Sequence, residues 1–265
     1  MNIPIYQVDA FASAVFAGNP AAVCVLERWL DDPVLQAIAA ENNLSETAFL
    51  VREGDGFALR WFTPAVEVAL CGHATLASAW VVFHELGWPG DTVRFHTRWS
   101  GVLPVTRVGE VLTLDFPARP AEECATPVGL EHALGARIEQ CYTSFEDLLV
   151  LTSDEAAVRA ARPDFRLLGK FAPRGVILTA RGEEVDFVSR FFAPAAGIDE
   201  DPVTGSAHCV LAPYWGGVLG KTTLHARQVS RRGGELTCTC HADRVLISGR
   251  AVPYLRGTIT LPAPA

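Results

Sequence analysis

The sequence lacks the features that mark nucleic-acid-binding, membrane and secreted proteins. Its 22 basic residues are outnumbered by 30 acidic ones, which gives a formal net charge of -8, and no basic run extends beyond Arg231-Arg232. This charge balance argues against a nucleic-acid partner, which requires a clustered positive surface. No stretch approaches the roughly 18 uninterrupted apolar residues of a membrane span, and "MNIPIYQVDAF" has no signal-peptide pattern. We therefore expect a cytoplasmic protein with no membrane partner.

Lysine is scarce, and the cysteines do not form a paired framework. Lys170 and Lys221 are the only lysines, which weakens any mechanism that forms a Schiff base. The seven cysteines are odd in number and scattered, a pattern typical of free thiols. The segment "CTCH" at 238–241 fits an alternating strand better than a metal site, because no second ligand cluster has suitable spacing.

The pattern of apolar residues points to an α+β fold. Short runs bounded by Gly, Pro or Asp predict strands at 3–8, 21–26, 47–51, 57–62, 111–116, 175–180, 186–192, 235–240 and 244–249. Helices are fewer, and we expect them at 32–42, 73–86, 152–162 and 206–219. Asp31 or Asp32 would cap the first helix, and Thr152 or Ser153 the third. Since strands outnumber helices, α+β is the expected class.

An internal repeat divides the chain into two similar halves. The segment "LRWFTP" at 59–64 precedes "LCGHATLASAW", and "SRFFAP" at 189–194 precedes "VTGSAHCVLAPYW". The arginine, phenylalanine and proline match at an offset of 130 residues, whereas Gly72 matches Gly205 at an offset of 133. We therefore predict two pseudo-equivalent units, each a strand, a loop and a glycine-led helix. The expected halves are 1–117, completed by a strand at 257–265, and 118–256, because the prolines and acidic pair of 116–129 interrupt the strand pattern.

Two glycine-led helix starts, Gly72-His73 and Gly205-Ser206, suggest an anion site. A helix N-terminus leaves backbone N–H groups unpaired and carries a positive partial charge, and glycine lets a ligand approach them closely. For a single copy, glycine as a mere turn or packing residue would be the better interpretation. The paired copies favour a small carboxylate bound in a cleft between the halves.

A proton-handling group is expected at Glu46, in "ENNLSETAFLV". This glutamate follows Ser45 where an apolar strand begins, so its carboxyl group is partly withdrawn from water, as suits a general acid-base. From composition alone, a capping or solvated turn glutamate would be the default interpretation.

The second half offers Asp201, the acidic residue of "IDEDPVTGSAH" placed nearest the helix start. It could orient a substrate amine or hydroxyl, or it could only complement the helix dipole. His73 and His208 could each act as a proton shuttle or be an ordinary hydrogen-bonded helix residue, and one functional histidine is more plausible than two.

Two residues near the expected site have open roles. Asn19, in the turn of "FAGNPAAVCVL", could present its amide to the cleft or only close the turn. Cys71 could be a reactive thiol at a helix start, but we interpret it as a small buried residue. A two-thiol racemase would need a partner cysteine at the matching place of the second half, where the sequence has Val203-Thr204.

Together these segments resemble the PhzF-like (phenazine biosynthesis) family of isomerases, which share the diaminopimelate epimerase fold. The matching segments are "VDAFASAVFAGNPAAV" at 8–23, "ENNLSETAFL" at 41–50, "RWFTPAVEVALCGHATLA" at 60–77 and "IDEDPVTGSAH" at 198–208. One departure is Gln228-Val229, where the family usually has Gln-Gly.

The resemblance implies two halves, each a mixed or antiparallel sheet wrapped around a central helix, with the active site between them. It also implies a homodimer with no cofactor and no metal. Glu46 looks like the catalytic acid-base, with His73 and Asp201 assisting it. Gly72 and Ser206 look like substrate-positioning groups, to which the repeat and the motifs add Asn19, Ser45 and Gly205 as candidates.

Three functions are compatible with these residues. The leading hypothesis is a cofactor-independent isomerase that moves a proton within a small carboxylate-bearing substrate. The second is an amino- or hydroxy-acid racemase or epimerase, which needs acid-base groups on both faces of one carbon. The third is a non-catalytic metabolite-binding protein, and the intact set of Glu46, His73 and Asp201 argues against it.

Overall fold

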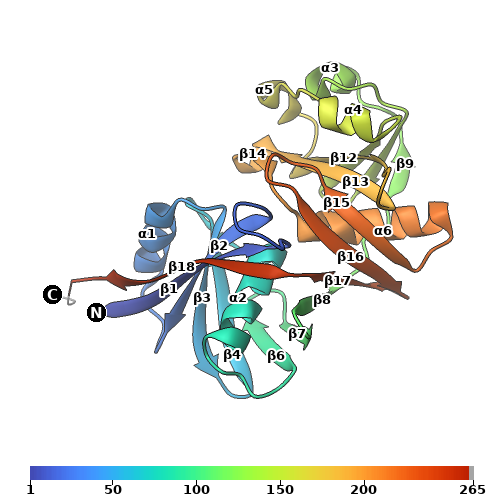
Figure 1. Ribbon diagram of the computed structural model, residues 1–265. Coiled ribbons are helices and arrows are strands. Elements are labelled where there is room, and N and C mark those ends of the chain that lie inside the picture. Colours follow the sequence, from blue (N-terminus) through green and yellow to red (C-terminus); the bar gives the residue numbers. More distant parts are fainter. Residues whose placement is uncertain (263–265) are drawn as a thin grey trace. The chain divides into compact units, whose positions relative to one another are not determined.

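The chain folds into two compact units (Figure 1). The structure is a computed structural model that describes residues 1–262. Unit 1 consists of Met1–Asp115 together with the chain from Ser248, and unit 2 of Phe116–Ile247. The strand that returns to unit 1 spans Ala251–Thr260; the expected strand at 257–265 overlaps its end, and residues 263–265 lie outside the described residues.

Unit 1 contains a mixed sheet in the order β18-β1-β2-β3-β4-β6-β7-β8. The pairs β2–β3 and β4–β6 are parallel and the other pairs of this order are antiparallel, while the short β5 pairs with β4. The elements are β1 (Asn2–Ala10), β2 (Asn19–Leu26), α1 (Asp32–Asn42), β3 (Glu46–Glu53), β4 (Gly56–Phe62), β5 (Glu67–Val68), α2 (Gly72–His84), β6 (Thr92–Thr97), β7 (Val102–Val108), β8 (Val111–Pro117) and β18 (Ala251–Thr260).

Helix α2 is the central helix of unit 1. It packs against β1, β2, β3 and β18, and every residue from His73 to Phe83 is buried. Its small side chains allow this close packing, and its two buried hydroxyls bond within the helix. Thr75 donates to the Cys71 carbonyl at 2.6 Å and Ser78 to the Ala74 carbonyl at 2.7 Å. The helix can therefore be enclosed by the sheet without stranding these polar groups.

Unit 2 repeats the strand pattern of unit 1. Its strand order is β9-β10-β11-β12-β13-β15-β16. As in unit 1, two pairs are parallel, β11–β12 and β13–β15, and the other pairs of this order are antiparallel. The elements are β9 (Glu122–Cys124), α3 (Leu130–Leu134), β10 (Gln140–Ser144), β11 (Asp147–Leu151), α4 (Glu155–Ala160), α5 (Phe165–Leu168), β12 (Gly175–Arg181), β13 (Phe187–Ala193), a 3-10 turn (Pro194–Ala196), β14 (Ile198–Asp201), α6 (Gly205–Leu219), β15 (Thr223–Gln228), β16 (Gly234–His241) and β17 (Arg244–Gly249). The predicted α+β class with two pseudo-symmetric halves is confirmed.

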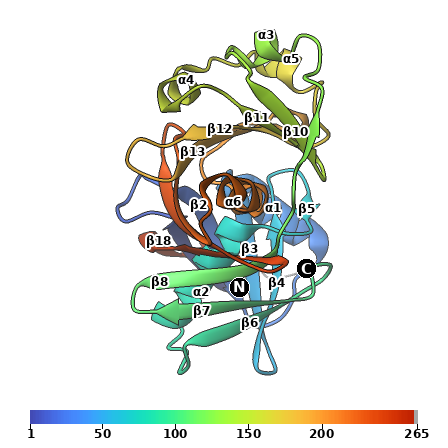
Figure 2. The ribbon, with the colours of Figure 1, turned by 90° about the vertical axis from the view of Figure 1, so that its right-hand side faces the viewer.

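Helix α6 is the counterpart of α2 and packs against β15 and β16; Figure 2 shows it along its axis. It contains Pro213, which has no N–H to donate to the Cys209 carbonyl one turn earlier. The backbone N–H of Arg119 donates to that carbonyl instead, at 2.9 Å. The segment that opens unit 2 is thereby fastened to α6.

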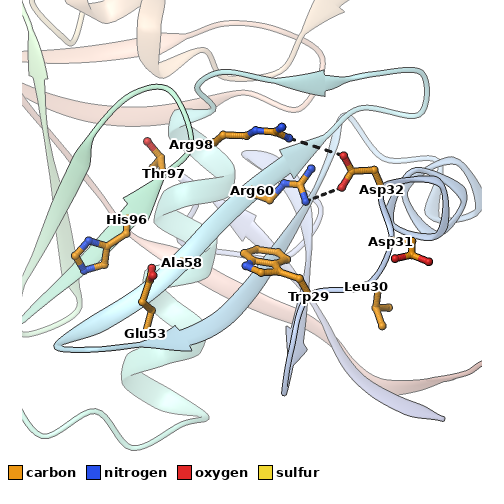
Figure 3. A pocket seen from close by; sticks show the side chains of 10 residues that line it. All are labelled: Trp29, Leu30, Asp31, Asp32, Glu53, Ala58, Arg60, His96, Thr97 and Arg98. Carbon is orange, nitrogen blue, oxygen red and sulfur yellow. Dashed lines mark ion pairs between the residues drawn. The ribbon is translucent and has the colours of Figure 1, made fainter.

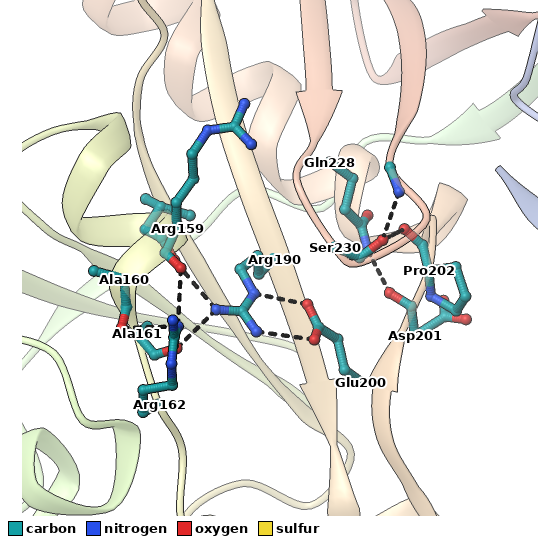
Figure 4. Close-up of polar contacts among 12 residues, drawn as sticks. Arg159, Ala160, Ala161, Arg162, Arg190, Glu200, Asp201, Pro202, Gln228 and Ser230 are labelled. Carbon is teal, nitrogen blue, oxygen red and sulfur yellow. Dashed lines mark hydrogen bonds and ion pairs between the residues drawn. The ribbon is translucent and has the colours of Figure 1, made fainter. Parts of the chain in front are cut away.

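The repeated arginines make the same ion pair in both units. Arg60 pairs with Asp32 (Figure 3) and binds Glu67 through two N–H···O contacts of 2.7 Å. Arg190 binds Glu200 through contacts of 2.7 and 2.9 Å (Figure 4). Each guanidinium also lies over the phenylalanine two residues later. The glutamate partner follows seven residues after Arg60 and ten residues after Arg190. This difference accounts for the three extra residues between the repeated arginine and the helix start in unit 2.

The predicted helix 152–162 is too long at both ends. Helix α4 spans Glu155–Ala160, and its N-cap is Asp154, whose carboxylate accepts from the Ala157 N–H at 2.8 Å. A carboxylate caps a helix at least as well as the hydroxyls of Thr152 or Ser153, so the helix begins later than predicted. The first helix matches its predicted range, with Asp31 in the N-cap position, although the Asp31 side chain makes no capping hydrogen bond.

Candidate active site

Glu46 and His73 form a buried pair in unit 1. Glu46 is the first residue of β3, and His73 is the second residue of α2, which packs on β3. Their side chains meet at 3.1 Å between Glu46 Oε2 and His73 Nε2, and both residues are at least nine-tenths buried. The contact is a close approach of the two groups rather than an aligned hydrogen bond. The strand start and the helix start thus bring an acid-base pair together inside one unit.

The other ring nitrogen of His73 faces two more buried side chains. His73 Nδ1 lies 3.1 Å from the amide nitrogen of Asn19, the first residue of β2, and 3.6 Å from Cys71 Sγ. In the neutral ring Nδ1 accepts a hydrogen bond from the Asn19 NH2 group, whereas in the cationic ring Nδ1 donates and Asn19 must turn its amide oxygen toward it. Asn19 and Cys71 thus fix the ring so that Nε2 faces Glu46.

The surroundings of His73 favour its charged form. Burial by itself would lower the pKa of His73, but the Cys71 sulfur and the Glu46 carboxylate outweigh it and raise that pKa well above its usual value. Burial, followed by the Glu46 charge, raises the pKa of Cys71 to about 11, so the thiol is neutral near pH 7. The Glu46 carboxylate is therefore the charge that holds a proton on His73.

Among the described residues, one group of side chains could hold a metal ion. It consists of Glu46, Cys71 and His73, with one ligand atom from each within 4.8 Å of the others. Glu46 faces Nε2 of the ring, whereas Cys71 contacts Nδ1. A single ion bound to one nitrogen cannot take both partners as they stand, so the arrangement fits proton transfer better than metal binding.

The start of α2 has no polar side chain as its N-cap. Its N-cap residue Cys71 makes no side-chain capping hydrogen bond, and the helix begins at Gly72. Unpaired N–H groups at the start of a helix attract anions. The predicted carboxylate site therefore lies one residue from His73.

The corresponding region of unit 2 is built around Asp201. Thr204, the N-cap residue of α6, donates its hydroxyl to Asp201 Oδ2 at 2.5 Å and makes no side-chain capping bond. Gln228 donates to the Asp201 carbonyl at 2.7 Å and accepts from the Thr204 N–H at 2.8 Å (Figure 4). The fully buried Gln228 thus fixes the loop from Asp201 to the helix start, although the residue after it departs from the family's usual Gly.

Ser206 has a partner that sequence reasoning missed. Its hydroxyl accepts from Arg174 Nη1 at 2.7 Å, while the rest of the guanidinium pairs with the buried Asp147. Burial raises the pKa of Asp147 even though Arg174 opposes this shift. Arg174 precedes β12 by one residue and no motif surrounds it, so only the fold reveals that it adds positive charge beside Ser206.

The predicted site residues fall into two groups, one in each unit. In unit 1 His73 contacts both Asn19 and Glu46, Gly72 begins α2, and Ser45 is the half-buried residue before β3. Asp201 ends β14 in unit 2, and Gly205 and Ser206 begin α6. None of these residues is among the described residues that line the pocket of unit 1 shown in Figure 3.

His208 is a structural histidine. Its Nδ1 lies 2.8 Å from the Thr204 carbonyl oxygen, its ring lies against Phe187, and its Nε2 has no hydrogen-bond partner among the described residues. Burial lowers the pKa of His208 to about 4. The residue is therefore neutral in the folded chain, which leaves His73 as the candidate of the two histidines considered.

His208 is expected to make the protein less stable in mild acid. Between pH 6.5 and 4 the unfolded chain takes up a proton at this residue while the folded chain does not, so the free energy of unfolding falls by about 3 kcal/mol as the pH is lowered through this range. Urea unfolding of wild type and His208→Gln across this range measures the effect. In His208→Gln, the fall in unfolding free energy between pH 6.5 and 4 should be smaller than in wild type by this amount. The control His132→Gln, at an exposed position, should show the same fall as wild type. An unchanged pH dependence in His208→Gln would contradict the assignment.

The chain matches a known protein family over most of its length. A family profile described as phenazine biosynthesis-like protein (PhzC-PhzF) matches residues 8–257. A protein named an uncharacterized isomerase from Pseudomonas aeruginosa is 56% identical over 98% of this chain and 100% of its own. The crystal structure of a PhzF-family protein from Enterococcus faecalis is 51% identical, covers 98% of this chain and 100% of its own, and superposes with a TM-score of 0.96.

More distant structures share the fold alone. A hydroxyproline epimerase from Agrobacterium vitis is 12% identical, covers 99% of this chain and 94% of its own, and has a TM-score of 0.63. Within the described residues, no helix is long and apolar enough to cross a membrane. With a profile match over most of its length and relatives named as isomerases that align along their whole length, the chain belongs to the phenazine biosynthesis-like (PhzC-PhzF) family of isomerases.

Proposed function

We propose that this protein is a cofactor-independent isomerase that moves a proton within a small carboxylate-bearing substrate. The observation that carries the proposal is the buried pair of Glu46 and His73, 3.1 Å apart, beside the uncapped start of α2. A buried carboxylate with a fixed imidazole suits general acid-base catalysis, and the helix start suits a carboxylate.

Glu46 is the group that moves the proton. As a carboxylate it removes a proton from a substrate carbon, and the electrons of the broken C–H bond shift into the adjacent unsaturated system. The neutral acid, whose proton exchanges with solvent, then returns a proton to another carbon. His73 keeps a positive charge beside Glu46 before the transfer, and that charge stabilises the anionic intermediate once Glu46 is neutral.

The residues of unit 2 complete the proposed site. We place Asp201 and Ser206 on the polar substituents of the substrate, with Gly205 giving access to the backbone donors of α6. The bond from Arg174 to the Ser206 oxygen leaves the hydroxyl proton of Ser206 free to donate to a substrate oxygen. Asn19, Ser45 and Gly72 are the corresponding positioning residues from unit 1.

A two-thiol racemase is less well supported. Cys71 is the N-cap residue of α2, and the N-cap residue of α6 at the matching position is Thr204. One thiol is therefore missing from the pair that would work on both faces of a carbon, and the raised pKa of Cys71, about 11, makes the other a poor base.

Replacing Cys71 by Ala is expected to leave turnover within a few-fold of wild type. The substitution removes the 3.6 Å contact of the sulfur with His73, but Asn19 still holds the ring. Steady-state rates on the identified substrate measure this. A loss of a hundredfold or more in a folded variant would bring the thiol into the mechanism.

Proton NMR in deuterium oxide tests the reaction itself. Wild-type protein is incubated with a panel of small carboxylic acids that includes cyclohexadiene amino acids, and the labelled carbon is identified. Deuterium at a carbon that gains a proton as the double bonds shift supports the isomerase. Exchange confined to one stereocentre would instead indicate an epimerase. Thermal stabilisation by a panel member that shows no exchange would indicate a binding protein.

The proposal extends to the assembly and location of the protein. A homodimer and a cytoplasmic location are the expectations from sequence, and light scattering on the purified protein tests the first of them. A monomer at micromolar concentration would remove the dimer from the proposal without affecting the chemistry of Glu46.

A further inference from the structure

Cys124 and Cys141 lie directly opposite each other in the sheet of unit 2. They are Cα partners in the antiparallel pair formed by β9 and β10. Directly opposite residues in such a pair have Cα atoms about 4.5 to 5.5 Å apart, and a disulfide requires about 4.4 to 6.8 Å. The backbone therefore already has the spacing of a cross-strand disulfide.

The two thiols are also close enough to affect each other. Both cysteines are free thiols, and Cys124 is one of the groups that raise the pKa of Cys141. Cys141 is buried in the hydrophobic core beneath α3, α4 and α5, whereas Cys124 lies at the edge of that core and is half-buried. A reagent in solution thus reaches Cys124 first, with the second thiol already beside it.

Cys124 belongs to a short edge strand. Strand β9 has three residues and pairs with β10 in the sheet. Burial, followed by the contact with Cys124, raises the pKa of Cys141 to about 12, so Cys141 remains a protonated thiol near neutral pH. The roles are therefore unequal: Cys124 reacts with the reagent, and Cys141 resolves the product.

We propose that Cys124 and Cys141 form a thiol oxidation site that takes a low-molecular-weight disulfide as its oxidant. The Cys124 thiolate attacks one sulfur of the small disulfide, giving a mixed disulfide and releasing one small thiolate. The Cys141 thiol gives its proton to solvent, and its sulfur attacks the sulfur of Cys124, which releases the second small thiolate. The two protein thiols are oxidised to one disulfide, and the small disulfide is reduced to two thiols.

The remaining cysteines of unit 2 provide a comparison within the same sheet. Cys209 and Cys238 are buried, and Cys240 is half-buried on β16, two residues from Cys238 along the strand. Neighbouring residues on one strand point to opposite faces, so Cys238 and Cys240 share a face but are too far apart along the strand to be bridged. A reagent from solution therefore reaches Cys124 and Cys240 before the buried Cys209 and Cys238, and of these two half-buried thiols Cys124 is the one with a second cysteine directly opposite it.

The disulfide would stabilise unit 2. It would link β9 to the strand that follows α3 and close a loop of the chain between residues 124 and 141. Closing a loop of this length restricts the unfolded chain, and the midpoint of thermal unfolding is expected to rise by about 5 °C.

Oxidised glutathione tests the proposal on the intact protein under native conditions. After acid quenching and alkylation, peptide mass spectrometry should find residues 124 and 141 joined, with two hydrogen atoms lost. Cys240→Ser should give the same product and the same thermal shift. Cys124→Ser should give neither, while its activity and its unfolding midpoint without oxidant stay near those of wild type.

Two results would overturn the proposal. One is a stable glutathione adduct on Cys124 that never resolves to the disulfide at excess oxidant. The other is a bridge between different cysteines, or a thermal shift that persists in Cys124→Ser.

Discussion

Replacing Glu46 by Gln is expected to lower turnover on the order of a thousandfold while leaving the protein folded. A positioned acid-base group contributes roughly 10² to 10⁴ to a rate, and in the proposed mechanism one carboxyl group performs both proton transfers. The glutamine amide has the same size and can still donate to or accept from its surroundings, but it cannot take up the substrate proton. The rate of substrate conversion and the rate of deuterium incorporation should fall together.

Glu53→Gln is the matched control for this experiment. Glu53 lies at the other end of the same strand, β3, and is exposed. It should retain wild-type rates, and both variants should unfold at midpoints close to wild type. Turnover of Glu46→Gln within about threefold of wild type would remove Glu46 from the catalytic role and would leave His73 as the only buried base of the pair.

Replacing Arg190 by Leu is expected to lower the free energy of unfolding by about 4 kcal/mol. Arg190 binds Glu200 through two contacts and also donates to the carbonyl oxygens of Val158 and Ala161, at 3.3 and 2.9 Å. The arginine and glutamate side chains are 12% and 19% exposed, so little water is available to replace the lost partner. The substitution would strand a largely buried carboxylate and remove one donor from the carbonyls at the end of α4 (Figure 4).

Arg227→Leu provides the control for this loss of stability. Arg227 pairs with Glu184 and Glu235, which are 78% and 70% exposed, so removing it should cost less than about 1 kcal/mol. Urea unfolding followed by tryptophan fluorescence measures both variants. A loss for Arg190→Leu no larger than that for Arg227→Leu would show that the repeated arginine pair does not hold unit 2 together.

The duplication could be predicted from the sequence because the repeated residues are ones that a fold accepts in few surroundings. A buried arginine needs a carboxylate partner, and the Arg60 and Arg190 segments supply one at spacings of seven and ten residues. The glycine-led helix starts were visible for a similar reason, since a helix that begins within a core needs small residues there. The glycine-led start of the first helix placed His73 in the predicted site, and the start of an apolar strand, with the family resemblance, placed Glu46 there. The structure brings their side chains into contact.

Other parts of the fold depend on pairings that the sequence does not display. Strand β10 reads Gln140–Ser144, with polar residues on its exposed positions and few apolar ones, and its place follows from pairing with β9 and β11. The bond from Arg174 to Ser206 joins residues 32 positions apart. Such contacts arise only when the sheet has formed, so local patterns carry no signal of them.

The proline within α6 determines where the start of unit 2 attaches. In a helix without proline, every internal carbonyl accepts a hydrogen bond from the N–H four residues later. A neighbouring segment of the chain then has no free carbonyl to bind, and no hydrogen bond fixes its position along the helix. Pro213 leaves one acceptor open, at Cys209, and the amide of Arg119 occupies it. That bond can form at only one position along the helix. The missing N–H of Pro213 therefore fixes how the segment at Arg119 aligns with α6, much as turns and bulges fix the register of a strand.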